Sequence, residues 1–169
     1  MLKVDLGRLA RERRIKIDDD VPADDPLWGG LDVTFQGPVT LRLVVQQAGA
    51  DVVVRGRLEA LAVLPCRRCL KAVRQELDEE LTFVFRSGVE ATEAEAEEAY
   101  PLPPRGQELD LTRPLREHVM LAVPQYVICD EACRGLCPRC GTNLNESTCD
   151  CVVEEEDPRW AALKRLRTE

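Results

Sequence analysis

The sequence is poor in histidine and in aromatic side chains. Its 169 residues include one histidine, and Phe, Tyr and Trp together make up 4%. A catalytic zinc site needs a general base and commonly a histidine or carboxylate ligand, so a zinc hydrolase is disfavoured. Few aromatic residues also leave little material for platforms on which single-stranded nucleic acids stack. The single histidine, His118, follows Glu117 and is interpreted as a surface imidazole rather than a catalyst.

Long hydrophobic runs are absent as well. Every apolar run is shorter than the ~20 residues that a membrane-spanning helix requires, so a membrane is not an expected partner. Residues 1–17 carry charges throughout and lack the apolar segment typical of a secretory signal. We therefore expect the chain in the reducing cytoplasm, where disulfides rarely persist.

Cysteine, in contrast, is abundant and arranged in pairs. Six of the eight cysteines lie within residues 129–151. In Cys137-Pro138-Arg139-Cys140-Gly141, the Pro and the Gly suit a tight turn whose N–H groups point at both sulfurs. Four pairs supply the ligands of two four-thiolate zinc sites, a reading favoured over disulfides or free thiols. The pairs, all predicted metal ligands, are in chain order Cys66 and Cys69, Cys129 and Cys133, Cys137 and Cys140, and Cys149 and Cys151.

The four pairs can be divided between two sites in two ways. The third and fourth pairs are separated by residues 141–148 and can close a small ribbon locally. The first pair would then join the second, and the shared ion would tie the two halves of the chain together. In the alternative arrangement, the second pair belongs to the local site instead.

The net charge of −8 does not by itself exclude a nucleic-acid partner. Acidic residues are concentrated in three blocks, at 78–80, 90–98 and 154–157. Association depends on local potential, and several basic residues lie beside the cysteine pairs, where a metal would hold the backbone rigid. These residues are either a solvated surface or contacts to RNA phosphates. The predicted RNA contacts are Arg67, Arg68, Lys71, Arg134 and Arg139.

Alternating hydrophobic residues predict an antiparallel sheet in the first half. Residues 31–35 suggest a short strand, and the ranges 39–46, 52–64 and 73–85 suggest three longer ones. The first cysteine pair then falls at the tip of the hairpin between the last two strands.

Two helices are expected further along. Leu111, Leu115 and Val119 form a helical stripe with Asp110 as its N-cap, and Pro124 ends it. A short final helix is predicted after Pro158.

These elements predict an α+β fold. It combines an antiparallel β-sheet or partial barrel, a long zinc-knuckle hairpin, one or two packing helices and a small C-terminal zinc-ribbon-like unit. We expect a poorly defined segment at 1–30, with a loop at 18–30, and a sheet-and-helix domain at 31–125 that includes an acidic, Pro-rich loop at 87–107. The Cys-rich zinc-binding unit with the final helix covers 126–169.

In combination the motifs resemble one family. They are Cys66-Arg67-Arg68-Cys69-Leu70, Leu121-Ala122-Val123-Pro124, the run from Cys133 to Gly141, Asn143-Leu144-Asn145 and Asp157-Pro158-Arg159-Trp160. The sequence from about residue 35 to 167 resembles the YceD family, the large ribosomal RNA subunit accumulation proteins. The resemblance implies a non-enzymatic role in ribosome assembly, with ribosomal RNA, the pre-ribosomal large subunit or a ribosomal protein as partner and no small-molecule substrate.

Two other functions stay open at this point. A thiol-disulfide oxidoreductase could use Cys66 and Cys69, because the arginines between them would lower a thiol pKa. Redox pairs of this spacing normally open a helix, however, and here a strand follows. A zinc-stabilised protein–protein adaptor is the other alternative, and capture of its partner would distinguish it.

Overall fold

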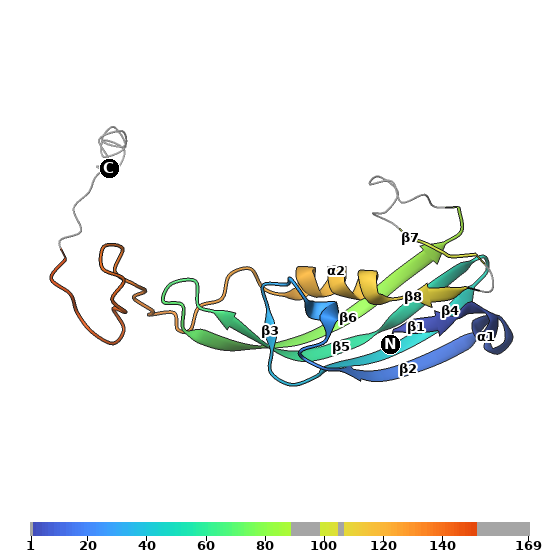
Figure 1. The fold of residues 1–169 in the computed structure, drawn as a ribbon, viewed down its shortest axis with the longest axis horizontal. Coiled ribbons are helices and arrows are strands. Elements are labelled where there is room, and N and C mark those ends of the chain that lie inside the picture. The colour runs from blue at the N-terminus through green and yellow to red at the C-terminus, as the bar shows by residue number, and fades with distance from the viewer. Residues whose placement is uncertain (1, 89–98, 105–106, 152–169) are drawn as a thin grey trace, which may run out of the picture.

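The main feature of the computed structural model is an open, six-stranded sheet (Figure 1). The structure describes residues 2–88, 99–104 and 107–151. Strand order is β2-β4-β5-β6-β7, with β3 also paired to β5; only the β6–β7 pair is parallel. The strands are β2 (Arg14–Val21), β3 (Thr34–Phe35), β4 (Val39–Ala48), β5 (Asp51–Pro65), β6 (Ala72–Arg86) and β7 (Tyr100–Pro101).

The three long strands confirm the period-two prediction. Along β4, β5 and β6, alternate hydrophobic side chains are buried in one core. At Gly56, β5 passes so close to β4 that a Cβ would come within 2.1 Å of the Arg42 carbonyl oxygen. Among the described residues β2 does not pair with β7, so the sheet is open and a closed barrel is not formed.

The N-terminal residues are more ordered than the sequence suggested. β1 (Lys3–Asp5) leads into α1 (Leu6–Glu12), and β2 then pairs with β4 along its whole length. The predicted loop at 18–30 is therefore wrong for residues 18–21, and the sheet begins at residue 14. The acidic run 18–20 hides the alternation, but in the sheet the Asp20 carboxylate accepts a hydrogen bond of 2.7 Å from the Thr40 hydroxyl.

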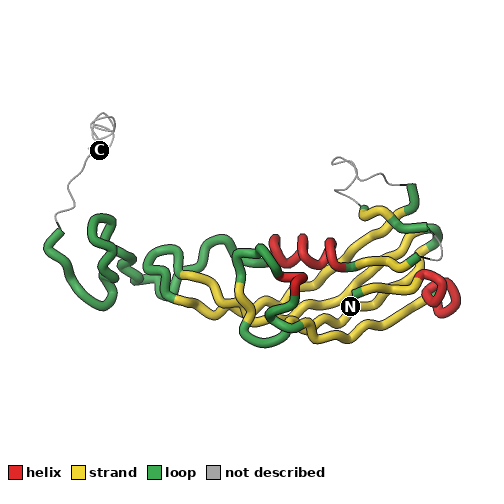
Figure 2. The backbone as a smooth tube through the Cα atoms, viewed as in Figure 1, coloured by secondary structure: helices red, strands yellow, loops and turns green. Residues whose placement is uncertain are grey.

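A second, two-stranded sheet and a helix complete the core. β1 pairs with β8 (Glu108–Asp110), and α2 (Thr112–Ala122) follows and lies against β6 (Figure 2). Leu111, Leu115 and Val119 are fully buried, as the helical stripe predicted. The carboxylate of Asp110 does accept a hydrogen bond from the Thr112 N–H, although the cap position itself is Leu111.

His118 differs from the expected surface imidazole. Its ring lies edge-on to the ring of Phe83, with the centroids 5.9 Å apart. The Nε2 atom is buried, and it has no hydrogen-bond partner within the described part of the chain. The surface interpretation was therefore wrong, because α2 turns this position toward β6.

The connection between β2 and β3 contributes buried side chains to the core. A short 3-10 turn, η1 (Pro26–Trp28), buries Leu27 and Trp28. No described helix is long and apolar enough to span a membrane. The predicted final helix and the acidic block at 90–98 lie outside the described residues.

Candidate metal centres

The first cysteine pair lies at the tip of the long β5–β6 hairpin. The strand pairing ends at Pro65 and Ala72. Beyond it, Cys66 donates its N–H to the Lys71 carbonyl at 2.8 Å, and the Leu70 N–H donates back to the Cys66 carbonyl at 2.9 Å. Leu70 has a φ of 61°, a left-handed conformation that allows the chain to turn so sharply.

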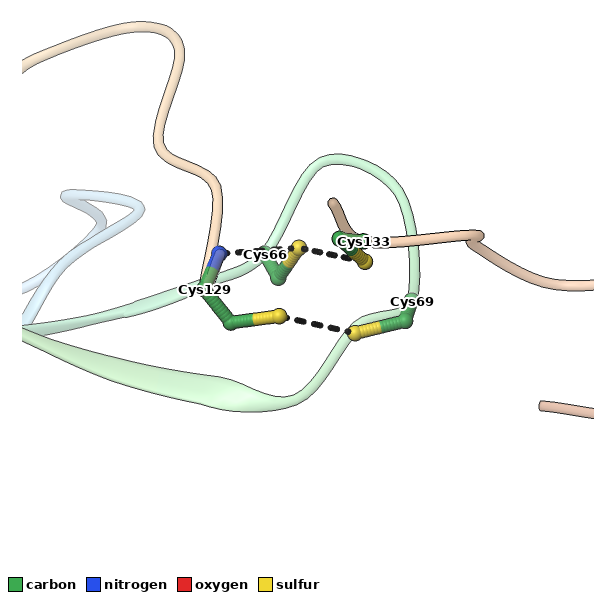
Figure 3. Close-up of side chains that lie close together, drawn as sticks. All are labelled: Cys66, Cys69, Cys129 and Cys133. Carbon is green, nitrogen blue, oxygen red and sulfur yellow. Dashed lines mark hydrogen bonds between the residues drawn. The ribbon is translucent and has the colours of Figure 1, made fainter. Parts of the chain in front are cut away.

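The second pair comes from the segment that follows α2. Arg67 N–H donates to the Val127 carbonyl at 2.8 Å and attaches this segment to the tip. The four sulfurs of the two pairs then lie within 4.8 Å of one another (Figure 3). Cys66 Sγ is 3.9 Å from Cys133 Sγ, and Cys69 Sγ is 3.5 Å from Cys129 Sγ. Four thiolates around one tetrahedral zinc are about 3.8 Å apart, so this group, here called the clamp, could hold a metal ion.

The surroundings of the clamp lower the pKa of some of its thiols and raise the pKa of others. Burial by itself raises the pKa of the Cys66 thiol, but N–H groups of Cys69, Arg68 and Cys129 outweigh it and lower that pKa to about 6. The sulfur of Cys69 is the main cause that raises the pKa of Cys129 to about 12. Four adjacent thiols cannot all ionise together without a cation, and a bound dication supplies the missing charge.

Two arginines at the tip bind the segment that carries the second pair. Arg67 donates through Nε to the Gln125 carbonyl at 2.8 Å. Arg68 donates through one terminal nitrogen to the carbonyls of Glu131 and Cys133, at 3.1 and 3.0 Å. Both side chains were predicted to contact RNA, and the structure shows that both hold the clamp together.

The other three predicted RNA contacts are exposed, two of them beside the clamp and one in the next cysteine turn. Lys71 directly follows the tip, Arg134 follows the last cysteine of the clamp, and Arg139 lies in the next cysteine turn. Lys71 and Arg134 are each within two residues of a cysteine of the clamp. The structure thus brings basic side chains from both halves of the chain to one end of the molecule.

The third and fourth pairs form a separate group, here called the distal group. Their four sulfurs also lie within 4.8 Å of one another. The turn repeats the geometry of the hairpin tip: the Gly141 N–H donates to the Cys137 carbonyl at 2.9 Å, and Gly141 has a φ of 73°. A hydrogen bond with the Thr142 hydroxyl is the main reason that the pKa of Cys140 is lowered to about 6, and Cys140 in turn raises the pKa of Cys151 to about 12. The thiols are therefore grouped in the first of the two arrangements that the sequence allowed.

One side chain connects the two groups, and the sequence analysis gave it no role. Asn145 donates through Nδ2 to Cys133 Sγ at 3.4 Å, and its Oδ1 accepts the Arg134 N–H at 2.7 Å. Leu136 N–H also donates to the Arg68 carbonyl at 3.0 Å. An asparagine between the third and fourth pairs was the available signal, but only the fold brings it to a sulfur of the clamp.

Comparison with known proteins identifies relatives in bacteria and plants. The family described as "Large ribosomal RNA subunit accumulation protein YceD" matches residues 54–167. An uncharacterized protein of Mycobacterium tuberculosis is 33% identical over 168 residues, covering 98% of this chain and 81% of that protein. The chloroplastic "Large ribosomal RNA subunit accumulation protein YCED homolog 1" of Arabidopsis thaliana is 41% identical over 71 residues, 42% of this chain.

The plant relative is much longer than the matched stretch, which spans 22% of it. No solved structure matches the chain. The family match nevertheless covers the hairpin tip, α2 and all eight cysteines. The chain therefore belongs to the YceD family of large ribosomal RNA subunit accumulation proteins.

Proposed function

We propose that this protein is a non-enzymatic, zinc-stabilised assembly factor that binds large-subunit ribosomal RNA or a precursor of the large subunit in the cytoplasm. The observation that carries the proposal is the clamp, a four-thiolate group with basic side chains around it, in a chain of this family. The clamp and the distal group would each hold one zinc ion, two per chain.

The donor sets support a structural role for both ions. Thiolates are soft ligands that suit zinc, and four protein ligands leave no open position for a substrate. Cys66 has no exposed surface and Cys69 is 6% exposed, so a substrate disulfide would not reach this pair. Burial of the first pair therefore favours the metal over the oxidoreductase alternative.

The basic residues near the clamp provide a physical means to bind RNA. Lys71, Arg134 and Arg139 extend from backbone that the ions would hold rigid, and phosphate contacts from such positions fix orientation. Arg67 and Arg68 each use some of their N–H groups internally and keep others for phosphates. Such contacts carry no base specificity by themselves.

The metal content is tested on protein purified without chelator. Elemental analysis should give two zinc ions per chain. A value near zero, together with eight titratable thiols in the folded protein, would contradict the zinc assignment.

The RNA role is tested by crosslinking in cells, followed by identification of the bound molecules. We expect fragments of large-subunit ribosomal RNA. A triple variant (Lys71→Gln, Arg134→Gln, Arg139→Gln) should recover less of this RNA while its zinc content and melting temperature match those of the parent. Recovery of protein partners without RNA would favour the adaptor, and normal large-subunit RNA levels in cells without this protein would exclude the assembly role.

A further inference from the structure

The outward face of the main sheet carries a regular array of side chains. Residues that pair across antiparallel strands point to the same face, so the pairing register defines rows across the sheet. Lys16 pairs with Val44, Val44 with Arg55, and Arg55 with Thr82. These positions are exposed or half-exposed, while the neighbouring positions along each strand are turned toward the core.

Three cations at the α1 end of this face have no acidic partner. Arg14, Lys16 and Arg55 are exposed, and none of them forms an ion pair within the described ranges. They occupy two adjacent rows that contain no carboxylate. The other members of these rows are Gln46, Val53 and Val84 in the first and Val44 and Thr82 in the second.

The sign of the charge changes along the strands. The next row is mixed and contains Asp18, Arg42, Arg57 and Glu80. Its two arginines are paired with carboxylates: Glu59 lies 3.8 Å from Arg42 and 3.6 Å from Arg57, and Asp78 binds Arg57 through both oxygens. The row after that contains Asp20, Glu59 and Asp78 and no cation. One mixed row thus separates the unpaired cations from a row in which every charged side chain is acidic.

This basic end is far from the clamp. Arg55 and Cys66 are eleven positions apart along β5 and its tip, which corresponds to about 35 Å of extended chain. Figure 1 shows the hairpin tip and α1 at opposite ends of the sheet. The acidic row lies between them, so the two basic regions do not form one continuous surface.

We propose that Arg14, Lys16 and Arg55 form a second contact surface for an RNA phosphate backbone, at the end of the sheet opposite the clamp. The inference rests on the proposed function, and it adds a separate surface to the contacts proposed around the metal. RNA is then bound at two places, and the acidic row keeps phosphates off the middle of the face.

The shape and chemistry of the surface favour a nucleic-acid backbone. The three cations span roughly 7 Å along the strands and 10 Å across them, a small patch that a single strand or one side of a duplex can cross. A flat anionic membrane would press against the acidic row as well, which like-charge repulsion opposes. The two basic rows contain no aromatic side chain, so contact is to phosphates and not to stacked bases.

The test compares two triple variants of the zinc-loaded full chain that lose the same charge from the same face. The patch variant is Arg14→Gln, Lys16→Gln and Arg55→Gln. The control variant is Arg42→Gln, Arg57→Gln and Arg74→Gln, in which the first two arginines are already paired with carboxylates. Binding of a labelled RNA hairpin is measured by fluorescence anisotropy at several salt concentrations.

We expect the patch variant to bind the hairpin at least about tenfold more weakly than the parent. The slope of log K against log salt should fall by roughly two to three, because each phosphate contact contributes about 0.9. The control variant should stay within about threefold of the parent. Hydrogen exchange of the parent should slow in β2 and β5 when RNA is added, a readout that does not depend on any variant folding.

The possible results separate this inference from the proposed function. If the patch variant binds like the parent, and β2 and β5 gain no protection, the second surface is wrong. This holds however the variant at Lys71, Arg134 and Arg139 behaves. If only the clamp variant (Lys71→Gln, Arg134→Gln, Arg139→Gln) loses binding, the proposed function stands without the second surface. If the patch variant alone loses binding, the second surface stands and the clamp contacts are wrong. A parent that binds no RNA hairpin contradicts both.

Discussion

At the residue scale, Asn145 is the side chain whose role is most specific. Its amide nitrogen donates to Cys133 Sγ in the clamp, while its amide oxygen accepts the Arg134 N–H. Hydrogen bonds from outside the ligand set hold metal ligands in position and stabilise their charge. Asn145 therefore contacts the clamp, although in sequence it lies between the cysteines of the distal group.

We predict that Asn145→Ala weakens zinc binding in the clamp by about 10- to 100-fold and leaves the distal group filled. Competition with a chromophoric chelator measures both affinities. Asn145→Asp is the matched control, because it keeps an acceptor for Arg134 and loses the donor to sulfur. If the Asn145→Asp variant retains the parent's zinc affinity in the clamp, the contact to Arg134 matters and the contact to the sulfur does not.

The two cysteine turns differ at one equivalent position. Leu70 follows Cys69 with a φ of 61° and a side chain that is 66% exposed, whereas Gly141 follows Cys140 with a φ of 73°. In both turns this residue donates its N–H to the carbonyl of the first cysteine. A leucine in the left-handed region is strained and glycine is not, so the tip stores strain that the distal turn lacks.

Leu70→Gly should therefore make opening of the tip harder by roughly 0.5–1 kcal/mol, because the lost strain exceeds the entropy cost of glycine. The reverse change, Gly141→Leu, should ease opening of the distal turn by roughly 1–2 kcal/mol. Apart from its two chain neighbours, no described residue has an atom within 4 Å of the added Cβ, so the backbone conformation decides the effect. Hydrogen exchange at the N–H of residues 70 and 141 reports each opening. If both substitutions change the free energy of opening in the same direction, or each acts opposite to this expectation, the turns relax to another conformation.

At the element scale, the clamp connects the β5–β6 hairpin to the segment after α2. The Arg67 N–H, the Arg67 and Arg68 side chains and the four sulfurs all contribute to this attachment. Without a metal, the hydrogen bonds remain but four thiols face one another. A metal bound by the clamp would therefore hold the second half of the chain more firmly to the tip.

Replacement of Cys66 and Cys69 by Ser should remove one zinc ion and leave one. Hydrogen exchange should become faster in residues 125–136, because their attachment to the tip is weakened. The matched variant with Cys137→Ser and Cys140→Ser should also lose one ion, with faster exchange confined to the distal group. Loss of both ions from either double variant would mean that the two groups are not independent, and it would contradict this arrangement.

At the scale of the whole molecule, the hydrophobic core and the clamp are separate. The buried cluster of the sheet, α1 and α2 contains no cysteine, and Cys66, Cys69 and Cys133 form a cluster of their own. The two clusters meet through Val73, which packs against both. The sheet therefore does not need the metal to bury its apolar surface.

Removal of zinc with a chelator should leave the main thermal transition of the sheet nearly unchanged. The thiols should become reactive, and exchange in residues 125–136 should increase, because an ion in the clamp would attach these residues to the tip. Leu58→Ala serves as the opposite control: Leu58 is fully buried, so this change should lower the free energy of unfolding by about 2–5 kcal/mol and leave two zinc ions bound before melting. Unfolding of the sheet by the chelator alone would show that core and clamp form one cooperative unit.

The sequence was most informative where a pattern is local. Alternation in β4, β5 and β6 and the helical stripe of α2 are set by short-range periodicity, and all four elements were found where predicted. β2 (Arg14–Val21) was not predicted: residues 14–17 fell in the segment expected to be poorly defined, and three consecutive aspartates at 18–20 look like loop until Thr40 and Arg42 lie opposite them. His118 was misplaced for a similar reason, since helical position alone does not say what packs against it.

By itself, the sequence predicted the four cysteine pairs as metal ligands and indicated the family of this protein, because both inferences rest on motifs that are local in the chain. Only the tertiary structure decided which pairs share a site, because Cys66 and Cys133 are 67 positions apart and meet through the hairpin and α2. The same holds for Asn145 at the clamp and for Arg14, Lys16 and Arg55 on one face. Their proximity arises from strand register and chain reversal, and neither leaves a local mark in the sequence.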